Sequence, residues 1–466
     1  MGHAVFEMER QLRSPGAMRH LQLVLTASAL VFSAQTALAQ APRAYDADDL
    51  GTLGGAMLLA AAMNSNGDIV GSGTTADGSQ HAFRWTRTGG LEDLGMFGGI
   101  DAQATGINDA GDIVGLYFDD QWISHAFFLP AGGTTIQPLD DVFQPSAVSA
   151  NGWFTGMSGG SRAFRATDGA PIQELTDIIG FGYAINGGGD TAGASFHGDW
   201  SKPTGPTAFR YTGADGFVEL GTFGGSSSYG FGINATGTVV GGAATPAGPR
   251  HAFRALPGQP LQDLGILFPN AEWSETIAYG VNDAGDVVGQ AGSTEQVVPF
   301  RYTDGTGLVN LSPLIPLAIR LNGRPYLAQA INANQQILLI YTDWAGEFRS
   351  ALLRPRTDVP APTISAVSAD PAVLSPPNGE MIPVTITVYA SDDYDGIPPC
   401  RITRVIDSAA RFGHPHHDVE MVDDYTVYLR ARLDHHHDHT YTVFVTCTNS
   451  LGGSAEGSTL VQVPRP

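Results

Sequence analysis

Four of the six tryptophans in this chain lie beside or close to a carboxylate. The pairs are Asp120 with Trp122, Asp199 with Trp200, Glu272 with Trp273, and Asp343 with Trp344. An exposed indole can stack on the C–H face of a sugar ring while a nearby carboxylate accepts hydrogen bonds from its hydroxyl groups. Loop indoles also pack over the edges of sheets and leave their carboxylates solvated. Both interpretations stay open, and the first predicts that these eight residues bind a glycan.

Histidines gather in two segments near the C-terminus. His414 and His416 lie in the first, and His435, His437 and His439 lie in the second. Alternate residues of an extended segment point to one side, and imidazole groups with nearby carboxylates can bind zinc or copper. These five histidines are therefore candidate metal ligands, although a histidine-rich loop also binds metals weakly without any biological role.

An acidic run at Asp392, Asp393 and Asp395 contains side chains that calcium accepts as ligands. It lacks the ligand, glycine and glutamate spacing of a dedicated calcium loop, which favours a solvated loop instead. We expect that the protein requires no cofactor.

Three further histidines begin a repeated His-Ala-Phe triplet, at His81, His125 and His251. One of them could act as a general base, but a residue repeated at equivalent positions usually serves the repeat itself. His197 lies outside this pattern and is the one weak catalytic candidate. No phosphate loop, dinucleotide fingerprint or zinc-protease helix is present in the sequence.

An internal repeat must position these residues. Seven copies of an apolar residue followed by a polar anchor have a mean spacing of about 45 residues, which is typical of four-stranded propeller blades. The anchors are Asn64, Asn108, Ser149, Asn186, Asn234, Asn282 and Asn332. Each copy predicts four strands, here named A to D: one ending at the anchor, one at Val-Val-Gly, one at His-Ala-Phe and one at Leu-x-Asp-Leu-Gly. The fold class is therefore all-β.

The order of strands along the chain predicts how the propeller closes. Asp49-Leu50-Gly51 is a D strand that precedes the first A strand, whereas no D strand follows the seventh copy. We therefore expect a seven-bladed β-propeller that the N-terminal strand closes. Alternating strand directions place the B-to-C and D-to-A connections on one face. The tryptophan-containing loops and His197 belong to that face.

These residues resemble bacterial extracellular proteins with HAF repeats, which are named for such triplets. The resemblance covers about residues 48–355, although four copies replace the histidine, with Arg162, Thr207, Val298 and Ser350. It implies a secreted repeat protein and brings no settled reaction with it.

After Arg356 the repeat stops, and period-two alternation predicts an immunoglobulin-like β-sandwich at residues 364–466 beyond a proline-rich linker at 357–363. Its two cysteines, Cys400 and Cys447, are the only ones in the chain and are expected to form a disulfide in an oxidising compartment. The segment also resembles C-terminal sandwich domains of bacterial secreted proteins, through Leu374–Asn378, Asp392–Asp395, Cys400–Ile402, Leu429–Ala431 and Val445–Cys447. That resemblance implies an accessory spacer or adhesion module.

Export is predicted by residues 1–39, which read as a signal peptide with Met18 as its start, followed by the propeller at residues 40–356. No later apolar stretch is long enough to span a membrane. The net charge is −22 without any Lys/Arg run, which excludes nucleic acid as a partner class. We expect a secreted or periplasmic monomer.

Three functions follow as hypotheses. The first is a non-enzymatic binding or scaffold protein whose propeller face engages an extracellular glycan or protein. The second is a polysaccharide lyase or glycosidase that uses the same face, with His197 as its weak candidate. The third is a metal-binding module built on the C-terminal histidines.

Overall fold

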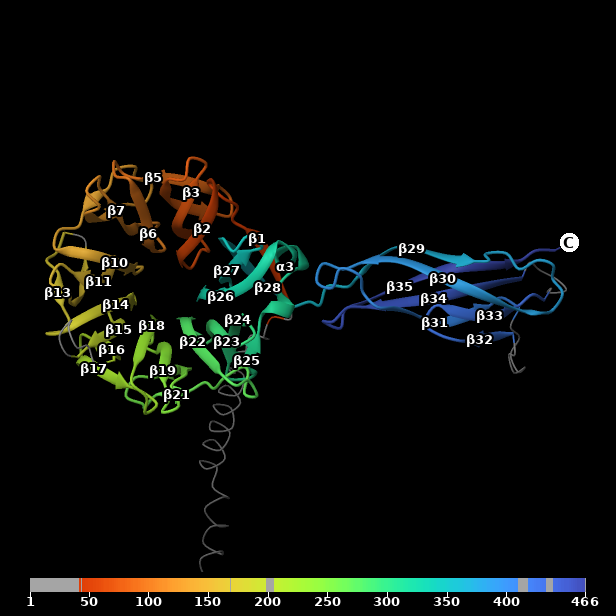
Figure 1. Ribbon diagram of the computed structural model, residues 1–466. Coiled ribbons are helices and arrows are strands. Elements are labelled where there is room, and N and C mark those ends of the chain that lie inside the picture. The colour runs from red at the N-terminus through yellow and green to blue at the C-terminus, as the bar shows by residue number, and fades with distance from the viewer. Residues whose placement is uncertain are drawn as a thin grey trace, which may run out of the picture. The chain divides into compact units, whose positions relative to one another are not determined.

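The computed structural model describes residue 42 and residues 44–167, 169–197, 205–409, 418–432 and 439–465. Antiparallel sheets from Ala44 to Arg356 are arranged radially around a central axis, as in a β-propeller (Figure 1). The described helical elements are the short α3 (Leu317–Asn322) and one 3₁₀ turn (Ser312–Leu314), so the all-β prediction is confirmed. Among the described residues, no helix is long and apolar enough to cross a membrane.

The predicted four strands occur in each copy of the repeat, in the order A, B, C, D. The first two copies are β2 (Gly54–Met63), β3 (Ile69–Thr75), β4 (Gln80–Thr86) and β5 (Gly90–Gly95), then β6 (Asp101–Ile107), β7 (Ile113–Phe118), β8 (Ser124–Leu129) and β9 (Gln137–Pro138). A single parallel bridge between Gln80 and Asp101 joins these two into an eight-stranded sheet.

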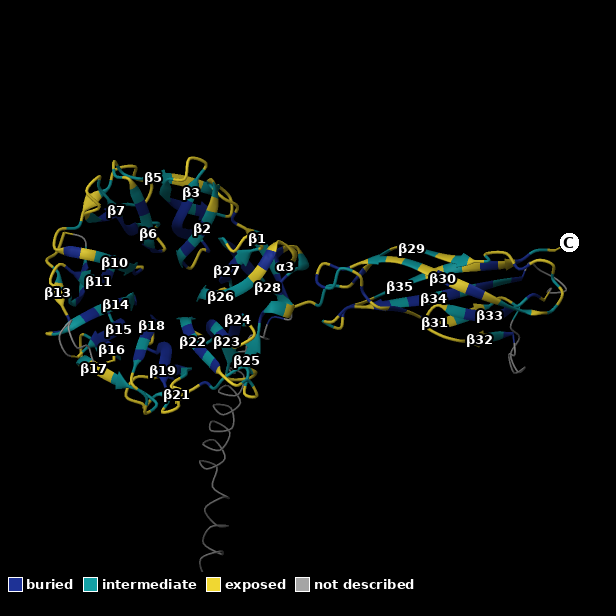
Figure 2. Ribbon diagram, in the orientation of Figure 1, coloured by how far each residue is buried: buried dark blue, intermediate teal, exposed yellow. Residues whose placement is uncertain are grey.

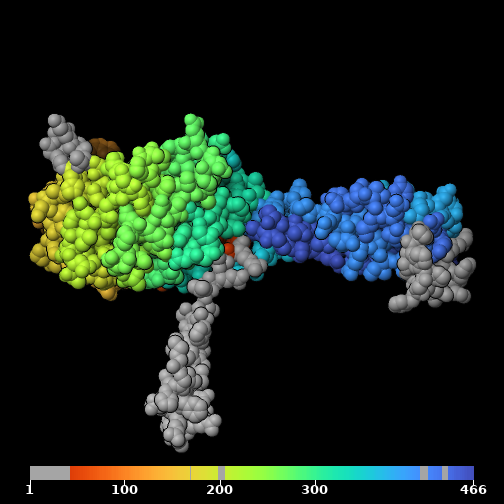
Figure 3. Space-filling view, turned by 90° about the horizontal axis from the view of Figure 1, so that it is seen from below, coloured from red at the N-terminus to blue at the C-terminus, as the bar shows by residue number. Residues whose placement is uncertain are grey.

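The next four copies form separate four-stranded sheets. They are β10 (Val142–Val148), β11 (Trp153–Ser158), β12 (Ala163–Thr167) and β13 (Gln173–Glu174); β14 (Ile179–Ile185), β15 (Thr191–Phe196), β16 (Thr207–Thr212) and β17 (Gly216–Gly221); β18 (Ser228–Ile233), β19 (Val239–Ala244), β20 (Arg250–Ala255) and β21 (Gln262–Asp263); and β22 (Ser274–Val281), β23 (Val287–Ser293), β24 (Val297–Thr303) and β25 (Gly307–Asn310). In Figure 3 the colours succeed one another along the side of the propeller, so consecutive copies are neighbours in space.

The last copy contains β26 (Gly323–Ile331), β27 (Ile337–Asp343) and β28 (Phe348–Arg356). Its fourth strand is β1 (Ala44–Asp49), which pairs antiparallel with β28 from the other end of the repeat region. This pairing is the one that the strand order predicts.

Glycines of the B strands explain how each sheet packs. The phenylalanine of every His-Ala-Phe-type triplet in the first six copies is fully buried, and in five of these copies, the third excepted, its ring lies over a B-strand glycine. A Cβ at Gly115 would come within 2.5 Å of the Phe127 ring, and one at Gly193 within 2.6 Å of Phe209. The glycine of the Val-Val-Gly motif therefore leaves the space that the phenylalanine ring of the His-Ala-Phe motif fills. Figure 2 shows this burial inside the sheets.

Anchor asparagines join five of the seven copies to the next copy around the axis. Oδ1 of Asn234 accepts the backbone N–H groups of Thr236 and Thr238, while its Nδ2 donates to the carbonyl of Asn282 at 3.0 Å. The same donation runs from Asn64, Asn186 and Asn282 to the following anchor. Nδ2 of Asn332 donates to the carbonyl of Ser65 at 3.2 Å, which links the last copy to the first.

The remaining strands form two sheets with one shared apolar core (Figure 1). One sheet contains β29 (Thr363–Asp370), β30 (Met381–Ser391), β33 (Thr426–Arg430) and β32 (Val419–Met421), and the other β31 (Cys400–Asp407), β34 (His439–Thr448) and β35 (Ser454–Val463). The predicted disulfide between Cys400 and Cys447 is confirmed. It joins directly opposed residues of β31 and β34 within one sheet, whereas the conserved bridge of antibody domains joins two sheets.

Candidate functional site

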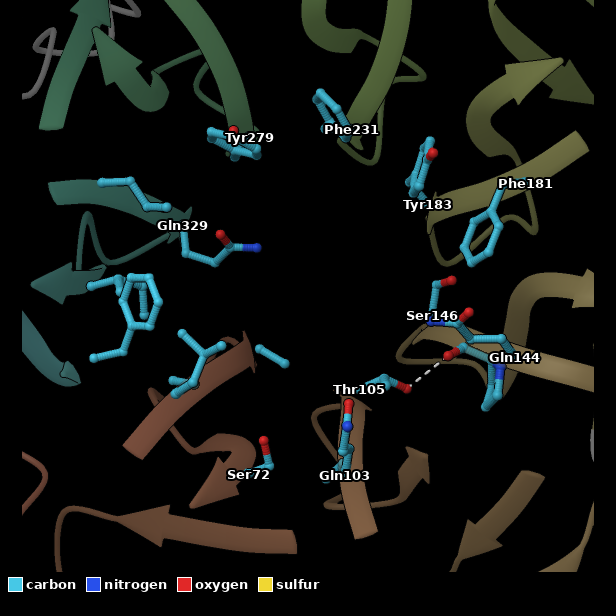
Figure 4. Close-up of a pocket in the computed structure, with 18 of the residues that line it drawn as sticks. Ser72, Gln103, Thr105, Gln144, Ser146, Phe181, Tyr183, Phe231, Tyr279 and Gln329 are labelled. Carbon is cyan, nitrogen blue, oxygen red and sulfur yellow. Dashed lines mark hydrogen bonds between the residues drawn. The ribbon is translucent and has the colours of Figure 1, made fainter. Parts of the chain in front are cut away.

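A cavity of about 550 Å³ lies where the A strands of all seven copies meet (Figure 4). It is lined by the residue three positions before each anchor and, in five copies, by the residue five positions before it, together with a few neighbours from the same sheets. The cavity volume is in the range of sites for small molecules.

A β-bulge positions one lining residue in every copy. The pairing register of each A strand with its B strand shifts at the residue three positions before the anchor. These bulge residues are Ala61, Thr105, Ser146, Tyr183, Phe231, Tyr279 and Gln329, and all seven line the cavity. A bulge redirects a side chain at the expense of regular pairing, which is why bulges are common beside functional sites.

Aromatic side chains occupy one arc of this cavity. The ring of Phe231 lies 5.2 Å from that of Tyr183 and 5.2 Å from that of Tyr279, which come from the neighbouring copies. Phe181 extends the arc, stacked on Tyr183 at 4.9 Å. Offset and tilted contacts at these distances are favourable for aromatic rings, so the arc is a preformed apolar wall.

Amides and hydroxyls occupy the adjoining arc, where Figure 4 shows Gln103, Thr105, Gln144 and Ser146, and mainly apolar side chains of the first and last copies line the rest. Thr105 Oγ1 donates to the carbonyl of Pro145 at 2.9 Å. Ser146 Oγ is buried without a hydrogen-bond partner among the described atoms. Burying a hydroxyl without a hydrogen-bond partner is costly.

The cavity is uncharged. None of the described residues that line it is acidic, basic or a histidine. Burial raises the pKa of Tyr183 and of Tyr279 to about 12, so both hydroxyls stay protonated at neutral pH and can donate hydrogen bonds. The cavity can therefore bind a neutral polar ligand with an apolar face, but it offers no group to act as an acid or base at neutral pH.

Toward the A-to-B turns the axis is lined differently. A second cavity of about 380 Å³ is lined by the anchors and their neighbours, among them the seven apolar residues that precede the anchors. Ile107, Val148, Ile185 and Ile331 are less than a tenth exposed there. The two cavities share no lining residue, and the uncharged cavity therefore lies toward the D-to-A end of the strands.

The predicted tryptophan sites occupy separate copies. Trp122 is 68% exposed and its ring lies 6.0 Å from Phe118 of the same copy. Trp344 is 64% exposed, and its indole N–H donates to the carbonyl of Leu321 at 2.6 Å. Trp273 is partly exposed beside Gly292. Each indole thus contacts its own copy.

The predicted carboxylate partners differ in their bonding. Asp343 accepts hydrogen bonds from the backbone N–H groups of Ala345 and Glu347 and forms an ion pair with Arg349. Its oxygens therefore stabilise a turn. Asp120 and Glu272 are exposed. Asp199 and Trp200 lie outside the described residues.

His197 forms a hydrogen bond with Glu219 at 2.5 Å. Glu219 also accepts the hydroxyl of Ser195, which is fully buried and bonds to the carbonyl of Thr207 as well. The serine therefore contacts the carboxylate and a carbonyl rather than the histidine, which is not the arrangement of an activated nucleophile.

The His-Ala-Phe histidines bond within their own copies. Nδ1 of His81 bonds Asp93 at 2.8 Å, and Nδ1 of His251 bonds Asp263 at 2.9 Å. In each pair, the aspartate belongs to the adjacent Leu-x-Asp-Leu-Gly strand, and the third copy places Arg162 and Glu174 at the equivalent positions. These histidines therefore serve the sheet.

Of the five predicted metal ligands, the structure describes His439 alone. Its ring is fully buried, with Nε2 bonded to Asp407 at 2.7 Å and Nδ1 to the carbonyl of Arg432 at 2.5 Å. Burial lowers the pKa of His439, but the two hydrogen bonds outweigh it and the net shift is upward. Neither ring nitrogen has a lone pair left for a metal, and the described residues contain no cluster of three metal-binding side chains. His414, His416, His435 and His437 lie outside the described residues.

The acidic run bonds to protein donors. Asp392 accepts the N–H groups of Tyr394 and Asp395 and the amide of Asn449, and Asp395 accepts the N–H and hydroxyl groups of Ser450. These carboxylates therefore stabilise a loop of the sandwich.

No protein-family model and no curated protein matches this chain. Among solved structures it is similar to the β-propeller domain of the Trilobed protease from Pyrococcus furiosus, with a TM-score of 0.44 and 8% identity over 68% of this chain and 98% of that one. It is also similar to TolB from Acinetobacter baumannii (TM-score 0.35, 14% identity, 62% of this chain and 64% of that one) and to the BP39L lectin from Burkholderia pseudomallei (0.38, 10%, 67% and 96%). Similarities this low carry no inference about activity.

The cavity was missed in the sequence, although the repeat contains its signal. The position three before the anchor changes from copy to copy, from alanine to tyrosine, while its surroundings stay constant. These departures from the repeat lie inside the A strands and not in the loops.

Proposed function

We propose that this chain is an exported, non-enzymatic binding protein that holds a neutral glycan in the uncharged cavity. The observation that carries the proposal is the division of the cavity into an aromatic arc and an arc of amides and hydroxyls. A pyranose ring has apolar C–H faces and a polar rim of hydroxyls, and therefore matches both arcs at once.

Charge supports a neutral ligand over an acidic one. The chain has a net charge of −22, and the cavity offers no cation to compensate an acidic sugar. Desolvating an unpaired carboxylate or sulfate in such a cavity is unfavourable. The absence of charged groups among the described lining residues also favours binding over acid–base catalysis by a lyase or glycosidase.

The architecture that we propose is a seven-bladed propeller of HAF-type repeats, closed by the pairing of β1 with β28. The bonds from Asn332 to the first copy support closure. The C-terminal sandwich, immunoglobulin-like in its two-sheet core, would act as a spacer. The predicted signal peptide and the disulfide support export to an oxidising compartment.

A glycan array with matched neutral and acidic saccharides tests this function. We expect the full chain to bind neutral members and to discriminate against their uronate or sulfate counterparts. Phe231→Ala removes the centre of the aromatic arc and should weaken binding by roughly 1–2 kcal/mol, which is about 5- to 30-fold in Kd.

Two further variants separate the site from general destabilisation. Tyr183→Phe deletes only a hydroxyl in the cavity and should lower affinity without a change in fold. Tyr389→Ala removes an aromatic ring that is 59% exposed on the sandwich and should leave binding unchanged. Binding of no neutral glycan, or equal binding by a folded Phe231→Ala protein, would refute the proposal.

A further inference from the structure

Five B-to-C turns share one backbone geometry. In each, the N–H of the fourth residue donates to the carbonyl of the first, and that fourth residue has a positive φ. The fourth residues are Gly78, Trp122, Ser161, Gly248 and Gly346. Three copies therefore use glycine, the residue that adopts this conformation without strain, and the second copy uses tryptophan at φ 61°.

Burial does not explain this tryptophan, because its side chain is 68% exposed. The turn is held by Asp119, whose Oδ1 accepts the N–H groups of Gln121 and Ile123, each at 2.9 Å. Oδ2 of Asp119 bonds His125, also at 2.9 Å. A bulky residue kept in the left-handed region and turned to solvent is a strained feature of the kind that accompanies function.

The turn lies on the side toward which the uncharged cavity is displaced. Gln103 of β6 lines that cavity, and Asp101, two residues nearer the D-to-A end, pairs with Phe118 of β7. The ring of Phe118 lies 6.0 Å from that of Trp122. With about 3.3 Å per strand residue and nearly 5 Å between strands, this path spans roughly 20 Å at most.

We infer that Trp122 is a stacking platform for a sugar ring outside the cavity, so that the ligand is an oligosaccharide or polysaccharide chain with one unit in the cavity and a later unit on the indole. Asp120 is exposed beside it and can accept hydroxyl hydrogen bonds. This inference rests on the proposed function, because it assigns the ligand's length and a second contact.

The test is Trp122→Gly, which installs the residue of three equivalent turns. Because glycine relieves the strain, we expect the urea midpoint to stay equal or to rise. The Kd for a mono- or disaccharide that fills the cavity should not change. The second probe is a neutral chain of six or more units of the same sugar, the shortest chain that we expect to reach Trp122. Its Kd should rise about 5- to 30-fold, as for the loss of one aromatic stack. Trp344→Ala removes an indole of similar exposure that is bonded to its own copy, and should leave both values unchanged.

Each alternative outcome is distinct. If the ratio of the Kd for long chains to the Kd for short chains is the same in Trp122→Gly as in the parent protein, the inference is overturned and the cavity proposal stands. A lower urea midpoint assigns the indole to packing and also overturns it. If the parent protein binds neither short nor long neutral saccharides, the proposed function itself fails.

Discussion

Replacing Asn234 by alanine should destabilise the propeller more than any surface substitution. The side chain is 5% exposed and makes bonds in two directions: Oδ1 accepts from Thr236 and Thr238 at 3.2 and 2.9 Å, and Nδ2 donates to Asn282 at 3.0 Å. Each bond is worth about 1 kcal/mol net, and a buried N–H that is left without a partner costs about 1–3 kcal/mol. Thr238 is only 3% exposed, so its N–H loses its acceptor at a buried position. We expect a loss of roughly 2–4 kcal/mol in the free energy of unfolding.

Tryptophan fluorescence during urea unfolding measures this loss selectively, because all six tryptophans precede the sandwich in the chain. Asn234→Ser should cost about half as much, since Ser149 fills the anchor position of the third copy and still accepts the N–H of Trp153 at 3.1 Å. Asn270→Ala, at an exposed loop position, is the control and should stay within about 0.5 kcal/mol of the parent. A loss below about 0.5 kcal/mol for Asn234→Ala would show that the anchors do not hold adjacent copies together.

Three further predictions concern the repeat, the sandwich and the disulfide. His81→Ala breaks a partly exposed pair and should cost less than about 1 kcal/mol, against about 3–5 kcal/mol for the fully buried Phe83→Ala, both measured by urea unfolding. The raised pKa of His439 means that its pairing with Asp407 stabilises the sandwich fully below the ordinary histidine value of 6.5 and less as pH rises through the raised value. Calorimetry of the full chain should show this decline, and His439→Gln should flatten it; an unchanged slope would contradict it. The lowered pKa of Asp407 adds stability that is lost only as pH falls through that lowered value. Replacing both cysteines by serine opens a loop of 47 residues and should destabilise the sandwich by about 4 kcal/mol, with no change in propeller fluorescence.

Much of the fold was predictable because each repeat carries local signals. The Asn-x-x-Gly turns, the B-strand glycines and the triplet phenylalanines each specify one contact inside a four-stranded sheet. Repetition then confirms every assignment several times. The strands of the sandwich each occur once, so no repetition supports their assignment.

The site was harder to predict, because its residues are far apart in the chain. Tyr183, Phe231 and Tyr279 follow one another at intervals of 48 residues in the sequence. The centre of the Phe231 ring nevertheless lies 5.2 Å from the ring centres of both tyrosines. In the sequence each reads as an ordinary strand residue. A loop tryptophan is conspicuous in the sequence by itself, whereas an arc of rings exists only after the copies are assembled.

The all-β class, the repeat and its strand order, the pairing of the first strand with the last copy, and the disulfide all follow from the sequence alone. These depend on local patterns, or on counting, and need no knowledge of distance. Tertiary structure decided which side chains face the axis, because the bulge in each A strand redirects one residue and seven strands must converge before those residues meet. It also showed that His81 and His251 bond neighbouring strands, and that a tryptophan occupies a turn position where three other copies have glycine.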